Sequence, residues 1–89
     1  MATNFDSFFM AGFECSTQRR RDGRRLDLLA STGHDRLAPQ DYRQVAGLGL
    51  RTVRDGLRWH LIEARPRDYD WSSFLPMLRA ARAAGVEAV

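Results

Sequence analysis

Polar and small side chains recur at every second position along a segment that otherwise has the composition of a strand. We predict a strand over residues 50–62, and every second residue from Arg54 then lies on one face: Arg54, Gly56, Arg58 and His60. The residues of the other face are apolar apart from one aspartate: Val53, Asp55, Leu57, Trp59 and Leu61. Strands inside an open parallel sheet are buried on both faces, so a polar face is unexpected there. It is expected in a (β/α)8 barrel, where it points into the lumen.

Two arginines and a histidine on that face are the first candidates for substrate contact. Arg58 and His60 lie toward the carboxyl end of the predicted strand, where barrel enzymes bind their substrates. The alternative for the arginines is structural, with Arg54 and Arg58 paired to buried carboxylates such as Glu14 or Asp55. His60 is either a hydrogen-bond donor to substrate or a loop histidine without contact to it.

Glu14 and His34 are two further candidates for a functional role. Glu14 closes an apolar run at residues 8–15, which we predict as the first strand. Its carboxylate either binds sugar hydroxyls or forms a salt bridge with Arg58 at the rim of the sheet. His34 and Asp35 provide too few ligands for a metal, so we predict no metal and place His34 on the surface or in an indirect supporting role.

Two helices and a third strand complete the predicted elements. Pro39 in the first turn, a stripe containing Tyr42 and a following Gly49 predict a helix over residues 39–48. A second helix is predicted over residues 73–84, with Ser72 or Ser73 as its cap and Gly85 at its end. A third strand starts at residue 86, and residues 16–37 are predicted as a long polar loop with a turn at Asp22-Gly23.

The order of these elements predicts an α/β fold with parallel strands and right-handed crossovers. The last strand is cut short at Val89, so we interpret residues 1–89 as the N-terminal βαβαβ portion of a (β/α)8 barrel, truncated in strand three. Strands of such a portion are left with unpaired edges, and we expect marginal stability or aggregation of the isolated chain.

The composition limits the cellular compartments and the classes of partner that we expect for this chain. The 89 residues include 14 arginines, no lysine and a single cysteine, and the net charge is +3. One cysteine excludes a disulfide framework, and we interpret Cys15 as a small buried residue in a reducing cytoplasm. The uncharged stretch at residues 7–13 is too short to span a membrane. The arginines at residues 19–25 are interpreted as a solvated face, so we predict neither a membrane nor a nucleic-acid partner.

No cofactor is predicted either. Gly47-Leu48-Gly49 is glycine-rich, but it follows a predicted helix. A dinucleotide fingerprint lies between a strand and the helix after it, so this segment lacks the required context.

The residues and their order together resemble the N-terminal part of a family 1 glycoside hydrolase of the β-glucosidase type. The resemblance covers nearly the whole chain and is carried by Gly12, Ser16, Gln18, Asp41-Tyr42, Gly49, Arg54 to Trp59, Glu63, Pro66, Tyr69-Asp70-Trp71 and Gly85-Val86. This sequence departs from the family pattern where Gly56 and Arg58 replace two serines and where Gln18 falls one position early.

The resemblance implies a carbohydrate-metabolising parent that hydrolyses O-glycosidic bonds by a retaining mechanism with two carboxylates. It implies that Arg54 lies near the nucleophilic carboxylate and that Gln18, or Glu14 in its place, binds sugar hydroxyls. The full set of expected substrate-binding residues is Glu14, Gln18, Arg54, Arg58, Trp59 and His60.

In the family the two catalytic glutamates belong to the fourth and seventh strands, so this chain holds no catalytic residue and we expect it to be inactive alone. Its partners are then a glycoside substrate and the remainder of the barrel. The alternatives are a different barrel enzyme, a barrel that only binds carbohydrate, and an arginine-rich nucleic-acid-binding module.

Overall fold

The structure is a computed structural model of the chain, and it describes residues 7–89; residues 1–6 of the predicted barrel portion lie outside the described residues. Its central element is a parallel sheet of three short strands in the order β1 (Ala11–Gly12), β4 (Thr52–Arg54) and β5 (Glu87–Ala88). Ala11 lies opposite Val53 in the register, and Val53 lies opposite Ala88. The predicted α/β class with parallel strands is therefore confirmed.

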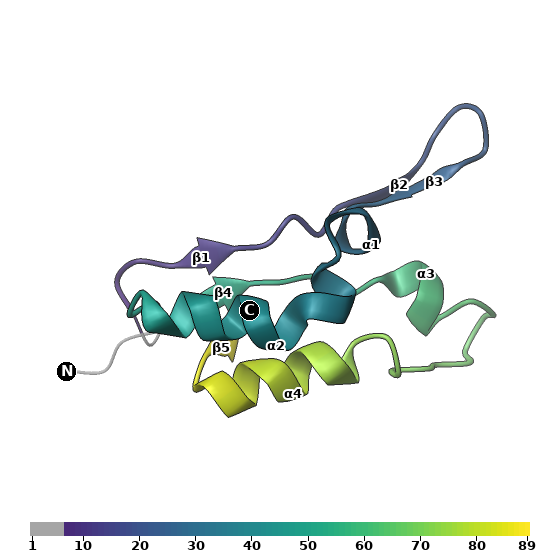
Figure 1. The fold of residues 1–89 in the computed structure, drawn as a ribbon. Helices are drawn as coiled ribbons and strands as arrows, with labels where there is room; N and C mark the ends of the chain where they lie inside the picture. Colours follow the sequence, from purple (N-terminus) through teal and green to yellow (C-terminus); the bar gives the residue numbers. More distant parts are fainter. Residues whose placement is uncertain (1–6) are drawn as a thin grey trace.

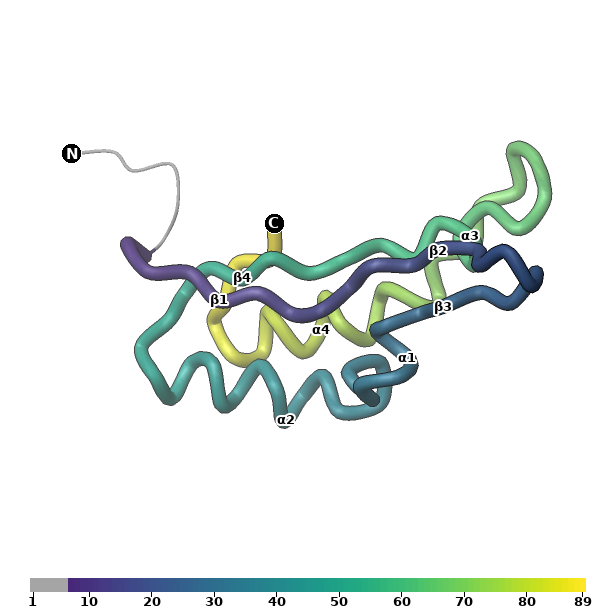
Figure 2. The backbone as a smooth tube through the Cα atoms, turned by 90° about the horizontal axis from the view of Figure 1, so that it is seen from above, coloured from purple at the N-terminus to yellow at the C-terminus, as the bar shows by residue number. Residues whose placement is uncertain are grey.

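Two helices cover one face of this sheet. Helices α2 (His34–Gly47) and α4 (Leu75–Ala84) lie side by side on the same side of the strands (Figures 1 and 2). Tyr42 from α2, Met77 from α4 and Val53 from β4 are almost fully buried between the layers. The core thus forms on the helix side. On the other face of β4, Arg54 is exposed, whereas Thr52 is fully buried.

The segment predicted as a long loop is folded, and this prediction is wrong. Strands β2 (Thr17–Arg19) and β3 (Arg25–Asp27) form an antiparallel hairpin, and the short helix α1 (Leu28–Thr32) follows directly. The predicted turn at Asp22-Gly23 is confirmed, because Gly23 adopts a φ of 83°, which favours glycine. Asp27 begins α1 by accepting a hydrogen bond from the backbone N–H of Ala30.

Helix α2 begins at His34, earlier than the predicted start at residue 39. Gly33, with a φ of 78°, ends α1 and allows the chain to turn directly into α2. Pro39 consequently lies inside the helix, where it cannot donate to the carbonyl of Asp35. Burial of His34 and Ala38 in the first turns stabilises this longer helix in spite of the proline.

The predicted strand over residues 50–62 is wrong beyond Arg54. The chain leaves the sheet after the N–H of Asp55 donates to the carbonyl of Val89. A one-turn helix α3 (Trp59–Ile62) then forms where the strand was expected to continue. The alternation counted from Arg54 therefore does not place Arg58 and His60 on the face of Arg54.

The remaining boundaries differ by smaller amounts. The first strand is limited to Ala11–Gly12 within the predicted 8–15, although the N–H of Phe13 still donates to the carbonyl of Arg54. Helix α4 begins at Leu75 rather than residue 73, and no serine side chain caps it. Gly85 ends α4 as predicted, with a φ of 71°.

Candidate functional site

The carboxyl ends of the three parallel strands share one edge of the sheet, and the long connections leave from this edge. Residues 13–33 link β1 to α2 through the hairpin, and residues 55–74 link β4 to α4 through α3. The connections at the opposite edge are short, at residues 48–51 and 85–86. Ligand sites of parallel α/β folds lie at the carboxyl ends of the strands, so this edge is the candidate site.

Arg54 and Glu14 lie on the face of the sheet that no described helix covers. Burial alternates from Gly12 onward, so that Gly12 and Glu14 are exposed while Phe13 and Cys15 are partly buried. The guanidinium of Arg54 lies over Gly12, since a Cβ built there is 3.3 Å from its Nη2 atom. Within residues 7–89 neither Arg54 nor Glu14 has an ion pair. These two side chains are the charged groups best placed to meet a ligand.

On the other side of β4, Asp55 is the centre of a buried polar network. Its Oδ2 atom lies 2.6 Å from the hydroxyl of Tyr42 and 2.8 Å from Nε2 of His34. Its Oδ1 atom accepts from the backbone N–H of Gly56 at 2.8 Å. The Asp55 side chain is 2% exposed, and these three contacts compensate for its burial.

His34 lies between two carboxylates. Its Nδ1 atom is 2.8 Å from Oδ2 of Asp41, and its ring stacks on Phe13 with a centroid distance of 3.9 Å. Each ring nitrogen therefore lies within hydrogen-bond distance of one carboxylate oxygen. Burial, followed by the hydrogen bond to Asp55, raises the pKa of Tyr42 well above its usual value, so this hydroxyl remains a donor.

This network positions the candidate site rather than contacting a ligand. His34 is 3% exposed, and it joins the first turn of α2 to the end of β4, directly beside Arg54. His34 is thus buried and not on the surface, and its carboxylate partners are Asp41 and Asp55.

A second polar cluster holds the hairpin against the segment after β4. Arg58 contacts Asp27 at 3.2 Å and Asp35 at 3.4 Å through Nη1, and its side chain is 8% exposed. Nε2 of His60 lies 3.6 Å from the same carboxylate of Asp27. Arg58 is therefore paired with carboxylates, as the structural alternative expects. Its partners are Asp27 and Asp35, however, and not the expected Glu14 or Asp55.

His60 in this cluster has a lowered pKa. Its burial contributes most and the nearby positive charge of Arg25 adds to it, while the carboxylate of Asp27 opposes them. Asp35 Oδ1, Arg58 Nε and His60 Nδ1 are buried without a hydrogen-bond partner among the described residues.

Trp59 belongs to an exposed aromatic group beyond the sheet. Its ring centroid lies 6.1 Å from Tyr69 and 6.0 Å from Trp71, and its Nε1 donates to Glu63 at 3.0 Å. The backbone N–H of Arg67, together with this indole, lowers the pKa of Glu63. Trp59 remains 47% exposed, so an aromatic surface is available beside the carboxyl edge.

The predicted site residues are thus brought together only in part. Glu14 and Arg54 share the uncovered face, and Arg58 and His60 meet at Asp27. Gln18 is exposed on the hairpin strand β2, and Trp59 lies on α3. The structure adds an Asp55 network that we did not predict. Asp41 and Tyr42 follow His34 by seven and eight residues, so all three lie on one helical face. This pattern appears only if the helix starts at residue 34.

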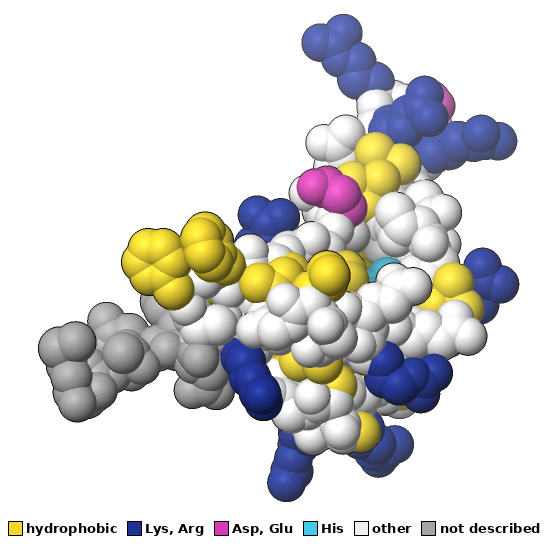
Figure 3. Space-filling model, turned by 60° about the vertical axis from the view of Figure 1, so that its left-hand side comes forward, with side chains coloured by type: hydrophobic (Ala, Val, Ile, Leu, Met, Phe, Trp, Pro, Cys, Tyr) yellow, Lys and Arg dark blue, Asp and Glu magenta, His cyan; other side chains and the backbone are white. Residues whose placement is uncertain are grey.

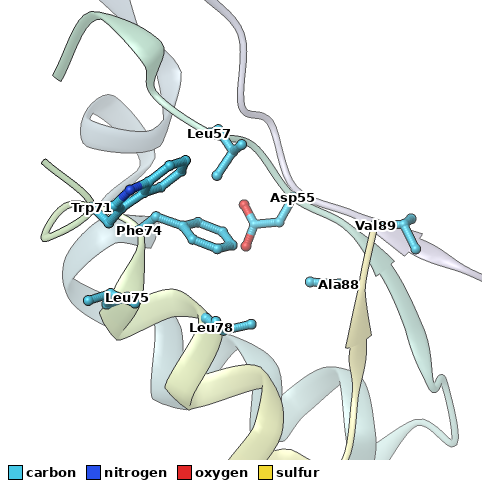
Figure 4. Close-up of a pocket in the computed structure, with 8 residues that line it drawn as sticks. All are labelled: Asp55, Leu57, Trp71, Phe74, Leu75, Leu78, Ala88 and Val89. Carbon is cyan, nitrogen blue, oxygen red and sulfur yellow. The ribbon is translucent and has the colours of Figure 1, made fainter. Parts of the chain in front are cut away.

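An apolar pocket of about 360 Å³ opens between α4 and the end of β5 (Figure 4). It is lined by Asp55, Leu57, Trp71, Phe74, Leu75, Leu78, Ala88 and Val89. The Asp55 carboxylate points toward Phe74 and is the charged group in this lining. Because its oxygens already accept from His34, Tyr42 and Gly56, the pocket presents mainly apolar walls.

Comparisons with known proteins leave the family open. The sequence matches no protein-family model, and neither the curated proteins nor the solved structures contain a match to it. Within residues 7–89 no group of three or more His, Cys, Asp or Glu side chains is arranged to hold a metal ion. None of the helices in the same range has the length and apolar character needed to cross a membrane.

Proposed function

We propose that this chain is the N-terminal βαβαβ portion of a glycoside hydrolase-like (β/α)8 barrel and supplies one side of its carbohydrate site. The observation that carries the proposal is the pair Glu14 and Arg54, exposed on the uncovered face of the sheet at the carboxyl ends of its strands. In a barrel this face is the lumen, and its upper end is where substrates bind.

The topology supports a barrel portion. Consecutive parallel strands are neighbours in the sheet, and both crossover helices lie on the same face. The first half of a doubly wound fold shares this arrangement, but its second face is covered by helices and is apolar. An exposed arginine and glutamate on that face favour a barrel lumen over a buried layer.

The chemistry of the proposed parent divides between this chain and the rest of the barrel. Retaining glycosidases need a nucleophilic carboxylate and an acid/base carboxyl group about 5 Å apart. The resemblance assigns both to later strands, and Arg54 would lie beside the nucleophile and favour its ionised form. Glu14 would accept hydrogen bonds from sugar hydroxyls, because an ionised carboxylate is a strong acceptor.

The test compares the chain with the complete reading frame that encodes it, assayed on p-nitrophenyl glycosides. We expect turnover by the complete protein and none by the 89-residue chain. Arg54→Ala in the complete protein is expected to lower kcat/KM by about 100-fold or more, because the nucleophile loses its stabilising cation.

Arg79→Ala is the matched control, since Arg79 is exposed on α4, and its kcat/KM should remain within about twofold of the wild-type value. Turnover by the 89-residue chain, or equal effects of the two substitutions, would contradict the proposal. Sugar binding by the complete protein without turnover would instead identify a carbohydrate-binding barrel.

A further inference from the structure

The positive charge of the chain is concentrated in one hairpin. Residues 19–25 contain five arginines and one aspartate, a charge of +4, whereas the whole chain carries +3. The rest of the chain is therefore slightly acidic. Every residue from 19 to 25 is exposed, and dark blue side chains gather at the top of Figure 3, over the hairpin. Charge segregated in this way creates a local positive potential that attracts anions.

The hairpin presents these arginines on an ordered turn. The backbone N–H of Gly23 donates to the carbonyl of Arg20 at 3.0 Å, and the N–H of Arg20 donates to the carbonyl of Arg24 at 2.7 Å. The Asp22 carboxylate accepts from the N–H of Arg24 at 3.0 Å and pairs with the Arg20 guanidinium at 3.5 Å. Arg19, Arg21, Arg24 and Arg25 have no acidic partner among residues 7–89.

The position of the hairpin relates it to the candidate site. It leaves the sheet on the carboxyl side of β1, a few residues after Glu14, and projects from the body of the molecule (Figure 1). At its base, Asp27 pairs with Arg58 at 3.2 Å and also begins helix α1. The arginines are therefore held at the same edge of the sheet as Glu14 and Arg54.

The side chains of the hairpin are suited to oxyanions. Guanidinium groups bind carboxylates and phosphates through two parallel hydrogen bonds. Residues 14–41 contain no Phe, Tyr or Trp, so the hairpin lacks the stacking surface that single-stranded nucleic acid requires. A shallow hollow of about 500 Å³ on the hairpin is lined by polar residues, namely Gln18, Arg19, Arg20, Arg21 and Asp22.

We propose that the hairpin binds an anionic glycan, a polymer with carboxylate groups along its length, such as a polyuronate. This proposal rests on the proposed function, because it specifies the substrate class of the same site. The arginines bind the carboxylates of sugar units that extend beyond Glu14 and Arg54. Selection among glycans then depends on charge at the rim, while the sugar hydroxyls are bound nearer to the sheet.

The test measures binding of the 89-residue chain to polygalacturonate across a salt titration. The hairpin variant is R20Q/R21Q/R24Q, and the control is R43Q/R79Q/R82Q, which removes the same charge from exposed positions on α2 and α4. We expect the hairpin variant to bind about tenfold more weakly or worse, with a smaller salt dependence, and the control to stay within about twofold. Circular dichroism confirms that the variants retain the fold.

Neutral galactan and duplex DNA serve as comparison ligands at matched salt. Weak binding of galactan supports the proposal. Equal losses in both triple variants, or no binding of polygalacturonate, would overturn it. Tighter binding of DNA would assign the hairpin to nucleic acid instead. The assay requires no hydrolysis, so hairpin-dependent glycan binding by a protein without glycosidase activity would contradict only the hydrolase proposal.

If the isolated chain does not fold, the same two triple variants are compared in the complete protein. There we expect the hairpin variant to raise the KM for a uronate substrate by about tenfold and to leave the KM for a neutral glycoside within about twofold. An equal change in both KM values would contradict the role of the hairpin.

Discussion

Asp55 makes three polar contacts at the end of β4, and its carboxylate holds the side chains of His34 and Tyr42 in place there. The Asp55→Asn substitution keeps the size of the side chain but removes the charge that faces His34 and Tyr42. We expect the free energy of unfolding to fall by about 2–4 kcal/mol, because buried donors lose a charged acceptor. Urea titration followed by the fluorescence of Trp59 and Trp71 measures this, with trimethylamine N-oxide added to secure a folded baseline.

The control for this substitution is Asp68→Asn, which changes the same group at an exposed position. Its unfolding free energy should stay within about 0.5 kcal/mol of the wild-type value. If both substitutions shift the unfolding midpoint equally, the Asp55 network does not stabilise the fold.

His60 makes stability depend on pH in a defined direction. Its pKa is lowered in the folded state by burial and by Arg25, so the unfolded chain binds this proton at a higher pH than the folded chain does. The free energy of unfolding therefore decreases as the pH falls below about 6.5, and this decrease ends once the pH is below the lowered pKa of His60 in the folded state. The His60→Gln substitution removes this contribution, and urea midpoints between pH 8 and pH 5 should then change less steeply.

The carboxylates of Glu63 and Asp70 affect stability in a separate, more acidic pH range. The backbone N–H of Arg67 lowers the pKa of Glu63, and the backbone N–H of Ser72 lowers that of Asp70. Their contributions are lost only as the pH falls below about 4, so they do not overlap with the effect of His60. If the urea midpoint of the His60→Gln protein changes between pH 8 and pH 5 as steeply as that of the wild type, His60 is not the source of the pH dependence.

At the scale of elements, Gly56 allows the chain after β4 to pass close to the chain after β1. A Cβ atom at Gly56 would lie 2.4 Å from the Cβ of Cys15, so the Gly56→Ala substitution forces these segments apart. We expect a loss of about 1–3 kcal/mol in the free energy of unfolding. Adding Cys15→Gly removes the opposing Cβ and should restore part of the loss, as measured by the same urea titration.

Gly47→Ala provides the matched control for this change. Gly47 ends α2 in open space, with no atom within 4 Å of an added Cβ, so alanine should be neutral or slightly stabilising there. Equal destabilisation at both glycines would show that the close approach of Cys15 is not the cause.

For the whole molecule, exposed apolar side chains predict self-association of the isolated chain. Leu75 and Leu78 line the open pocket beside β5, and Phe8 and Phe9 are 92% and 72% exposed. Such surfaces favour contact between molecules, as do the outer edges of β1 and β5, which no strand within residues 7–89 pairs. We expect sedimentation velocity to show association that increases with protein concentration.

Replacing both Leu75 and Leu78 by Gln should shift the chain toward the monomer, because it makes the pocket walls polar. Leu48→Gln is the control, since Leu48 is 78% exposed at the end of α2, away from the pocket. A wild-type chain that stays monomeric and melts cooperatively would count against this prediction.

The sequence by itself determined the parallel α/β order and the end of α4. Alternating apolar runs and helical stripes are local signals, and Gly85 supplies the left-handed conformation that ends the helix. The turn at Asp22-Gly23 is equally local. The position of Arg54 on the face opposite Val53 could also be predicted, because it follows from side-chain alternation within the strand that does form.

Only the tertiary structure decided the partners of the buried charged groups. His34 meets Asp55 across 21 positions of sequence, and Arg58 meets Asp27 across 31, distances over which no periodic pattern specifies a pairing. The chain leaves the sheet at Asp55, which removed the alternation on which the predicted positions of Arg58 and His60 depended. Desolvation requires each buried charge to find a partner, and the fold alone determines which partner lies within reach.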